Sequence, residues 1–268
     1  MMTEWLCRRW LVLGFAAVQV AVACTSGAAT FSTIAFSDAF VANGPTGNLS
    51  NNNYGGGGAL GLAAGNLPLG EFQTVLQFNL SSVRNSLDAQ YGAGSWTIQS
   101  VSLQLTASPH NNVIYNDIAA GQFNVSLMQN NSWVEGTGTA GIPTTDGISF
   151  NSLQNIYINN ALDQALGTFS FGGTTSGANS YSLALASGLL SDVLNGSALS
   201  VRLFAADDQV SYLFSSRTSG ASSVRPTLIV QAVPEPSPLT LYLLGVVTLL
   251  LWRRKMSRFA KFAYQRRK

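Results

Sequence analysis

Few side chains in this sequence belong to the types that carry out acid–base or nucleophilic chemistry. His110 is the only histidine, and it lies in the turn-rich stretch SPHNNVIYND. A general base must lie within hydrogen-bond reach of the group it deprotonates, and the chain contains no nucleophile-elbow motif. We therefore expect His110 to be a surface residue and assign no catalytic residue.

Four carboxylates, Glu135, Asp146, Asp207 and Asp208, are the candidates for glycoside hydrolysis. That reaction needs two carboxyl groups at a set separation across the scissile bond, which only the folded chain can supply. The other interpretation is that all four are solvated loop or turn residues. Asp207 and Asp208 lie between two expected strands, so they either cap a hairpin or help to hold a structural calcium ion through carboxylate and carbonyl oxygens. No other cofactor is predicted.

The cysteines limit the remaining chemistry. Cys7 and Cys24 are the only two, and both lie near the N-terminus, ahead of the expected domain. With no other thiol and a single histidine, the rest of the chain can form neither a disulfide nor a Cys/His zinc site. A body of about 200 residues can bury a sufficient core without disulfides, and one domain is the simplest division.

The N-terminus has the order of a secretory signal peptide. Arg8 and Arg9 precede an apolar run over residues 10–23, and small residues follow, which matches the n-region, h-region and cleavage site that signal peptidase recognises. We expect cleavage after Ala29 and export of the chain. The alternatives are a lipoprotein box ending at Cys24 and twin-arginine export, but the neighbouring residues match neither pattern well.

Charge separates the exported body from the ends of the chain. Residues 30–232 contain four arginines and no lysine against ten carboxylates, a net charge of −6, although the whole chain sums to +2. Nucleic acid is excluded as a partner, because phosphate contacts are made mainly by Lys and Arg. Arg217 and Arg225 lie near expected strands, where each is expected to pair with a carboxylate.

Alternation of apolar and polar residues predicts a series of short strands. Period two is typical of antiparallel sheets with one buried face, so we expect an all-β fold, a jelly-roll-type antiparallel β-sandwich. In the first strand the alternation centres on Ile34, Phe36 and Phe40. The expected strands are FSTIAFSDAFV, FQTVLQFNL, WTIQSVSLQLTA, FNVSLMQN, YSLALA, ALSVRLFAA, VSYLFSS and RPTLIVQA.

Two stretches have helical features, and one long stretch has the features of neither a helix nor a strand. SGLLSDVLNG predicts about two helical turns, capped by Ser187 and stopped by Gly196. LQNIYINNALDQAL is compatible with helix or strand. Residues 43–70 are rich in Gly and Asn, which suit turns, so this stretch is expected to be a loop.

The C-terminus carries a three-part pattern. It consists of the motif residues Val233, Pro234, Glu235 and Pro236, an apolar run over residues 239–252 and the basic residues Arg253, Arg254 and Lys255. The run has 14 residues, about 21 Å as a helix against a hydrocarbon core of about 30 Å. The basic cluster obeys the positive-inside rule and would stop the chain at the cytoplasmic face.

This pattern resembles the PEP-CTERM sorting signal. The resemblance implies export in a Gram-negative bacterium, anchoring in the inner membrane, and cleavage near Pro-Glu-Pro by an exosortase-type enzyme. It further implies a final place on the cell surface or in the extracellular matrix, among exopolysaccharide and biofilm. A basic cytoplasmic tail, 256–268, extends beyond the usual end of this signal. The expected division is therefore signal peptide 1–29, domain 30–232, sorting signal 233–255 and that tail.

The body resembles the DNRLRE-type domain, a jelly-roll β-sandwich of bacterial surface proteins. The resemblance covers most of residues 31–231, and its most specific piece is the stretch WVEGTG at 133–138. It also rests on FSDAFV, VLQFNLSSV, WTIQSVSLQL, DDQVSYLFSSR and RPTLIV. Relatives of this domain include carbohydrate-binding modules, some of which act on alginate.

Two functions from different classes remain. The first is a non-catalytic surface or matrix protein that binds polysaccharide through loops and exposed aromatic residues. Tyr54, Trp133 and Tyr157 are the candidates for stacking on sugars, and each fits a place in the core equally well. The second is a polysaccharide lyase or glycoside hydrolase on the same scaffold. A body with one histidine and no lysine favours the first.

Overall fold

The computed structural model describes residues 27–44, 49–66, 70–108, 121–171 and 177–236, together with 242, 245–249 and 252. The chain divides into two compact units. The larger unit comprises residues 29–93 and 98–232, and it holds nearly all of the described strands. Residues 94–97 and the chain from 233 onward belong to the other unit.

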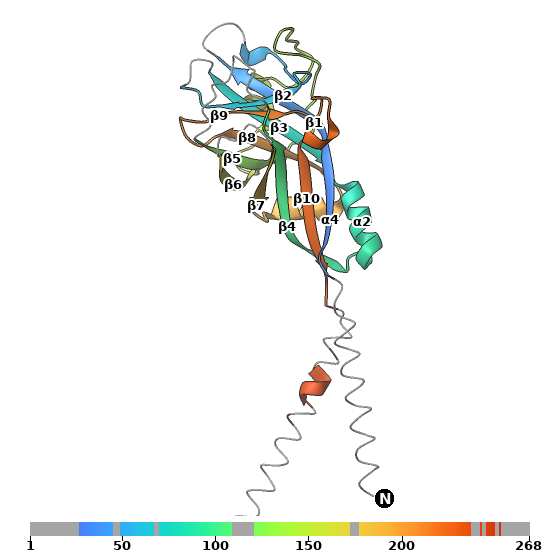
Figure 1. The fold of residues 1–268 in the computed structure, drawn as a ribbon. Helices are drawn as coiled ribbons and strands as arrows, with labels where there is room; N and C mark the ends of the chain where they lie inside the picture. The colour runs from blue at the N-terminus through green and yellow to red at the C-terminus, as the bar shows by residue number, and fades with distance from the viewer. Residues whose placement is uncertain are drawn as a thin grey trace, which may run out of the picture. The chain divides into compact units, whose positions relative to one another are not determined.

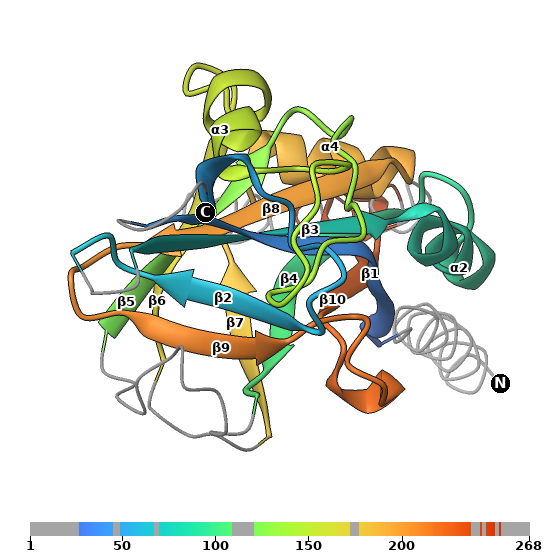
Figure 2. The same ribbon diagram turned by 90° about the horizontal axis from the view of Figure 1, so that it is seen from above.

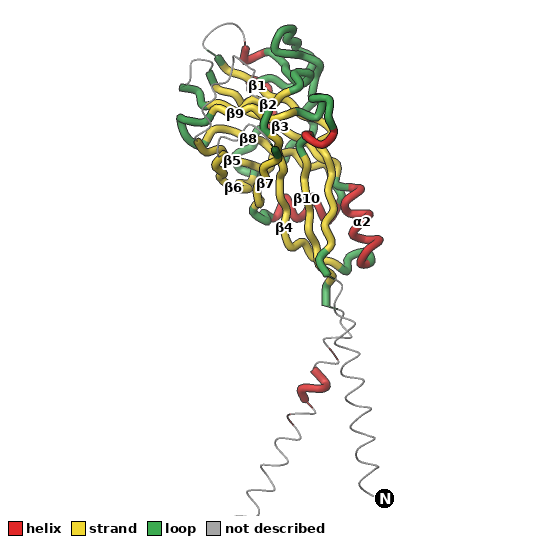
Figure 3. The backbone as a smooth tube through the Cα atoms, in the orientation of Figure 1, coloured by secondary structure: helices red, strands yellow, loops and turns green. Residues whose placement is uncertain are grey.

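Strands are the main regular secondary structure of the larger unit, as Figure 3 shows. The strands are β1 (Ala29–Asn43), β2 (Ala59–Ala63), β3 (Glu71–Asn79), β4 (Trp96–Thr106), β5 (Gly121–Met128), β6 (Gln164–Phe171), β7 (Ala178–Leu183), β8 (Ala198–Ala205), β9 (Ser211–Ser215) and β10 (Thr227–Pro234). The helical elements are η1 (Leu49–Asn51), α2 (Ser81–Tyr91), α3 (Phe150–Ser152), η2 (Leu153–Tyr157), α4 (Ser187–Asn195) and η3 (Ser222–Val224).

The sheet is antiparallel and nearly closed (Figure 1). Its strands follow the order β6-β5-β8-β3-β1-β10-β4-β7, and β2 and β9 branch from β3. The two ends of this path approach each other, because the backbone N–H of Ala184, just after β7, donates to the Leu166 carbonyl of β6 at 2.8 Å. The predicted antiparallel all-β character is therefore confirmed.

Strand β1 changes partner along its length. Its first part pairs with β10, from Ala29 opposite Ala232 to Ile34 opposite Thr227, and its second part pairs with β3. A register shift between Ala35 and Ser37 marks the change, as expected for a bulge, which bends a strand. Beside this bend the side chains of Ile34 and Phe36 are each 45% exposed. The expectation that both would belong to a buried face is wrong.

Two strands lie where the sequence predicts none. Strand β2 occupies the glycine-rich stretch predicted to be a loop, and it pairs with β9 from Ala59 opposite Ser215 to Ala63 opposite Ser211; Figure 2 shows the two strands side by side. Strand β6 takes the end of the ambiguous stretch, and the π-helical turn η2 takes its beginning. Pairing with β9 and β5 decides these segments, and the local pattern does not contain that information.

Helix α4 confirms the helix predicted over SGLLSDVLNG, with one correction at its start. Gly196 ends the helix in the left-handed conformation (φ 65°), which costs glycine little. The N-cap is Ala186, which makes no side-chain cap bond, so the prediction that Ser187 caps this helix is wrong. Helix α2 was not predicted, although Val83 and Leu87 are buried at the four-residue spacing of a helical face.

The interior of the sheet is filled by aliphatic and aromatic side chains. Phe123 of β5 is fully buried and meets Tyr181, Tyr212 and Phe214 edge-on, with ring centroids 5.1 to 6.2 Å apart. Edge-to-face contacts of this kind suit the ring quadrupoles. They join strands β5, β7 and β9 around one apolar centre.

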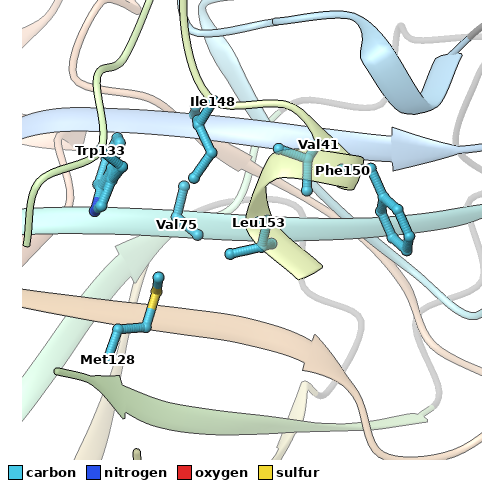
Figure 4. Close-up of a cluster of buried hydrophobic side chains, with 8 residues drawn as sticks. Val41, Val75, Met128, Trp133, Ile148, Phe150 and Leu153 are labelled. Atoms are coloured by element: carbon cyan, nitrogen blue, oxygen red, sulfur yellow. The ribbon is translucent and has the colours of Figure 1, made fainter. Parts of the chain in front are cut away.

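A second cluster lies on the outer face of β1 and β3. Strand β3 is buried from Phe72 to Phe78 on both faces. One face points into the interior of the sheet, so the other must be covered by another part of the chain. Residues 129–163, which run from the end of β5 to the start of β6 and which we call the covering segment, provide that cover. Figure 4 shows its apolar side chains packed on the strands. The cluster comprises Ala39, Val41, Val75, Met128, Trp133, Ile148, Phe150 and Leu153.

The expected leader and the basic residues Arg253, Arg254 and Lys255 lie outside the described residues. Within the apolar run 239–252, Tyr242, residues 245–249 and Trp252 are described, and they are helical. Among the described residues, no helix combines the length and the apolar character needed to cross a membrane.

Candidate functional site

Two parts of the covering segment line a groove of about 590 Å³ on the surface. We call it the amide groove, because four of its nine lining side chains are carboxamides. One wall follows β5 directly, and the other begins in η2 and continues toward β6. The lining residues are Gln129, Asn130, Asn131, Ser132, Ile156, Tyr157, Ile158, Asn159 and Leu162.

A single carboxylate ties the two walls of the amide groove together. Asp163 Oδ1 accepts from the backbone N–H of Gln129, and Asp163 Oδ2 accepts from the backbone N–H of Asn159, each at 3.0 Å. Asn130 adds a second link, since its Nδ2 donates to the Ile156 carbonyl at 3.5 Å. Because the walls lie about 27 residues apart in sequence, these long-range bonds set the width of the groove.

Several polar groups of the lining have no partner among the described residues. Asn131 Nδ2 donates to the Ala198 carbonyl at 3.0 Å, but Asn131 Oδ1 is buried without a hydrogen bond. The side-chain amide of Gln129, Nδ2 of Asn159 and the hydroxyl of Tyr157 are likewise unbonded within the described part of the chain. Since Asn131 Oδ1 is buried, the free groups that can meet a ligand in the groove are those of Gln129, Asn159 and Tyr157.

Apolar surface lies beside these polar groups. Ile156 is 63% exposed and Leu162 is 55% exposed, while Tyr157 and Ile158 pack at the margin of the outer cluster. No lining side chain carries a charge. The amide groove therefore combines unpaired hydrogen-bonding groups with exposed apolar surface and a partly exposed aromatic ring.

The three aromatic residues predicted to stack on sugars lie in different environments. Tyr54 is buried and stacks on Phe40, with ring centroids 4.7 Å apart and planes 6° from parallel. Trp133 is buried in the outer cluster, and its Nε1 donates to Ser200 Oγ at 2.9 Å. Tyr157 alone of the three lines the amide groove. Nothing in the sequence separates it from the other two, because the contacts that bury them come from distant strands.

A partly buried group of charges holds the start of the covering segment. Arg217 binds Glu135 through two parallel bonds, Nε to Oε1 at 2.7 Å and Nη2 to Oε2, so the prediction that Arg217 pairs with a carboxylate is confirmed. Asp38 is fully buried, and its Oδ2 accepts from the backbone N–H of Arg217 at 2.6 Å while its Oδ1 has no partner. Arg225 Nε also lies buried without a hydrogen-bond partner among the described residues.

Burial raises the pKa of Asp38 from 3.8 to about 6, and the charge of Glu135 adds to the rise. The backbone N–H of Arg217 and a hydrogen bond with Ser216 oppose it. One guanidinium thus stands near two carboxylates, and Asp38 takes up a proton as the pH falls through about 6.

Asn53 fixes the middle of the covering segment. Its Nδ2 donates to the carbonyls of Glu135 and Ile148 at 2.6 and 2.8 Å, and its Oδ1 accepts from the N–H groups of Gly55 and Gly138, each at 3.1 Å. The side chain is fully buried and all of its hydrogen-bonding groups are used. Asn53 stands in the run NNNY within an Asn-rich stretch, which gives no sign of this role.

The remaining carboxylate candidates accept hydrogen bonds from backbone and hydroxyl groups. Asp146 accepts from the hydroxyls of Thr144 and Thr137 and from the Thr137 backbone N–H, and these bonds lower its pKa to about 2. Asp207 Oδ1 accepts from the backbone N–H groups of Gln209 and Val210 at 2.9 and 3.1 Å, and its Oδ2 accepts from the backbone N–H of Gln122 in β5 at 2.6 Å. Asp207 therefore caps the turn between β8 and β9, but the predicted hairpin is wrong, because β8 pairs with β3 and β5 while β9 pairs with β2.

The calcium and histidine candidates add no further site. Asp208 is exposed at the same turn as Asp207. Among the residues that the structure describes, no group of three or more His, Cys, Asp or Glu side chains is placed to hold a metal ion. His110 lies outside the described residues, so its predicted surface position stays a prediction.

The motif Val233–Pro236 begins within the last strand. Val233 and Pro234 end β10, and the backbone N–H of Glu235 donates to the Ser95 carbonyl at 2.9 Å. Glu235 and Pro236 are exposed. Comparison with known proteins adds no assignment, since no family model and no curated protein sequence matches the chain.

Replacing Asn53 by aspartate tests its role in the covering segment. Asn53→Asp removes both N–H donors and places a carboxylate oxygen against the carbonyls of Glu135 and Ile148. We expect a loss of about 3 kcal/mol or more in the free energy of unfolding, measured by denaturant titration, with faster hydrogen exchange in residues 133–149. Asn66→Asp is the matched control at an exposed position. Equal losses in both variants would show that Asn53 has no special role.

Replacing Asp38 by asparagine tests the buried charge. Because the pKa of Asp38 is 3.8 in the unfolded chain and about 6 in the folded one, the folded state prefers the protonated form. Its contribution is most favourable below about pH 4 and is lost as the pH rises through 6. Asp38→Asn has no such loss, so its stability relative to the parent protein should rise by about 2.4 kcal/mol between pH 4 and pH 7.5.

Denaturant unfolding across that pH range measures this difference. Burial also raises the pKa of Asp192 to about 6, but this residue contributes equally to both proteins and cancels. Asp208→Asn changes an exposed carboxylate and serves as the control. If parent protein and Asp38→Asn lose stability in parallel as the pH rises, Asp38 is not the titrating group.

Proposed function

We propose that this protein is an exported, non-catalytic surface or matrix protein that binds polysaccharide through the amide groove. The observation that carries the proposal is the lining of the groove, in which free amide and hydroxyl groups alternate with apolar surface. Sugars present hydroxyls at their edges and C–H groups on their ring faces, so they need both kinds of contact. Binding sites commonly combine apolar surface with a few well-placed polar groups in this way.

The contacts can be assigned to the two walls. Tyr157, Ile156 and Leu162 supply the apolar surface, and a tyrosine ring offers a flat face with a polar end. The side-chain amides of Gln129 and Asn159 supply hydrogen bonds to sugar hydroxyls. Asp163 is a positioning residue, because both of its oxygens bind backbone N–H groups of the walls.

We propose a non-catalytic role because the acidic side chains are already committed to the fold. Glu135 is held by Arg217, Asp38 is fully buried, and Asp146 accepts three hydrogen bonds from its own loop. A glycoside hydrolase needs a carboxylic acid and a carboxylate that both reach the scissile bond. These bonds favour binding over the alternative of a lyase or hydrolase.

The jelly-roll sandwich is the finer architecture that we infer for the domain. Its support is the division of β1, whose first part joins β10, β4 and β7 while its second part joins β3, β8, β5 and β6. A strand that passes between two sheets through a bulge is a usual way to make the corner of a sandwich. An apolar interior between the sheets, centred on Phe123, agrees with it.

Export and sorting are part of the same proposal. The expected signal-peptide cleavage follows Ala29, the sorting motif begins at Val233, and β1 and β10 pair Ala29 with Ala232. This register supports the proposal, because signal peptidase and an exosortase-type enzyme would both cut beside the same end of the domain. The exposure of Glu235 and Pro236 leaves that part of the motif accessible to a processing enzyme.

Binding to the exopolysaccharide of the native cells tests the proposed groove. We expect the exported protein to co-sediment with that polysaccharide, and Leu162→Ala and Asn159→Ala to lower the bound fraction several-fold, because both side chains are exposed groove residues. Leu194→Ala removes a similarly exposed leucine, 48% against 55%, from outside the groove and should bind normally. Unchanged binding by both groove variants would refute the site.

The intact mass of protein recovered from outside native cells tests the processing. We expect an N-terminus near Thr30 and a C-terminus near Pro234–Pro236. A variant with Pro234 and Pro236 replaced by alanine should stay in the membrane fraction with residues 239–268 attached. A mass from the parent protein that retains residues 239–268 would rule out the sorting proposal and leave a membrane-held protein.

A further inference from the structure

We propose that the amide groove selects an uncharged polysaccharide and rejects polymers of uronic acids. This inference rests on the proposed function and names the class of ligand for the same site. Two features carry it: the chemistry of the groove lining and the net charge of residues 30–232.

The lining contains nothing that would balance a ligand charge. Its nine side chains comprise four carboxamides, two hydroxyls and three aliphatic groups. Recognition of a carboxylate usually employs Arg or Lys, and most effectively a two-bond contact with Arg. A uronate in this groove would give up its hydration for neutral amides alone, whereas a neutral sugar loses no charge–water interaction.

The charged residues beside the groove are already engaged. Asp163 follows the lining residue Leu162, but both of its oxygens accept backbone N–H bonds from Gln129 and Asn159. Arg202 lies on the neighbouring strand β8. Its Nε donates to Gln73 Oε1 at 2.7 Å, and its guanidinium lies 4.2 Å from the ring centroid of Phe204. Neither residue lines the groove.

The charge of the domain acts in the same direction over a longer range. Residues 30–232 carry a net charge of −6 with no lysine. A net negative field lowers the local concentration of a polyanion and slows its association. An acidic polysaccharide would therefore be disfavoured both on approach and in the groove.

Binding of defined oligosaccharides to the exported protein tests the proposal. The probes are hexasaccharides of neutral β-glucan, mannan and chitin on one side, and hexasaccharides of alginate and polygalacturonate on the other, measured by calorimetry in 50 and 500 mM NaCl. We expect at least one uncharged probe to bind with an affinity that changes less than twofold with salt. We expect no binding of either uronate.

Groove variants link that binding to the site. Leu162→Ala and Asn159→Ala should each weaken binding of the neutral probe at least fivefold, and Tyr157→Ala at least tenfold, whereas the control Leu194→Ala should not. Because Tyr157 also packs against the outer cluster, Tyr157→Ala is interpreted only if its unfolding midpoint matches the parent protein. If the midpoint of Tyr157→Ala differs, the test rests on Leu162→Ala and Asn159→Ala, which change exposed side chains.

The outcomes separate this inference from the proposed function. Uronate binding that the groove variants weaken would overturn the uncharged class and leave polysaccharide binding standing. Binding of a neutral probe that no groove variant weakens would overturn the site, and with it the inference. Failure of every probe, together with failure to bind the native exopolysaccharide, would overturn the proposed function itself.

Discussion

The organisation of this protein depends on the burial of β3 from both sides. A strand with apolar residues on both faces must be covered twice, and here the second cover is an irregular segment of the same chain. The regular structure of the covering segment is limited to the helical turns α3 and η2, so its conformation relies on contacts with other parts of the chain. Asn53 holds it through three side-chain hydrogen bonds, with Glu135, Gly138 and Ile148, and Trp133 anchors it to Ser200. The amide groove is a consequence, because both of its walls are parts of that cover.

Asp38, Glu135 and Arg217 form a group of charges at the start of the covering segment. Arg217 satisfies Glu135 with two bonds, and Glu135 Oε1 accepts from the backbone N–H of Asp38 at 3.2 Å. Asp38 is then left with the backbone N–H of Arg217 and a hydrogen bond with Ser216 but no cation of its own, so burial raises its pKa. The Arg217–Glu135 pair is partly buried, with side chains 34% and 13% exposed, and such pairs contribute little net stability. Their value here is geometric, because they tie β1, the covering segment and the turn at Arg217 together.

Much of the strand pattern follows from the sequence. The alternation in β1, β3, β4, β5, β7, β8, β9 and β10 is a local property, since side chains two residues apart share a face of the sheet. Helix α4 was likewise evident from its apolar spacing and from Gly196. Strands β2 and β6 and helix α2 were not, because glycine-rich or polar segments become strands or helices only when a partner is present. Ile34 and Phe36 are exposed although the alternation predicts that they are buried, because they lie beside the register shift at which β1 changes partner.

The sequence by itself determined the composition of the body, with its net negative charge and its lack of cysteine and lysine, and most of its antiparallel strands. It also determined the motif Val233–Pro236, the apolar run and the basic cluster as a pattern at the C-terminus. Only the tertiary structure decided that Tyr157 lines a groove while Tyr54 and Trp133 lie in the core. It alone also brought Asn53, Asp38 and Arg217 to the covering segment. The physical reason is distance along the chain, because alternation and capping act within a few residues, whereas a groove and a buried charge are made by residues tens to hundreds of positions apart.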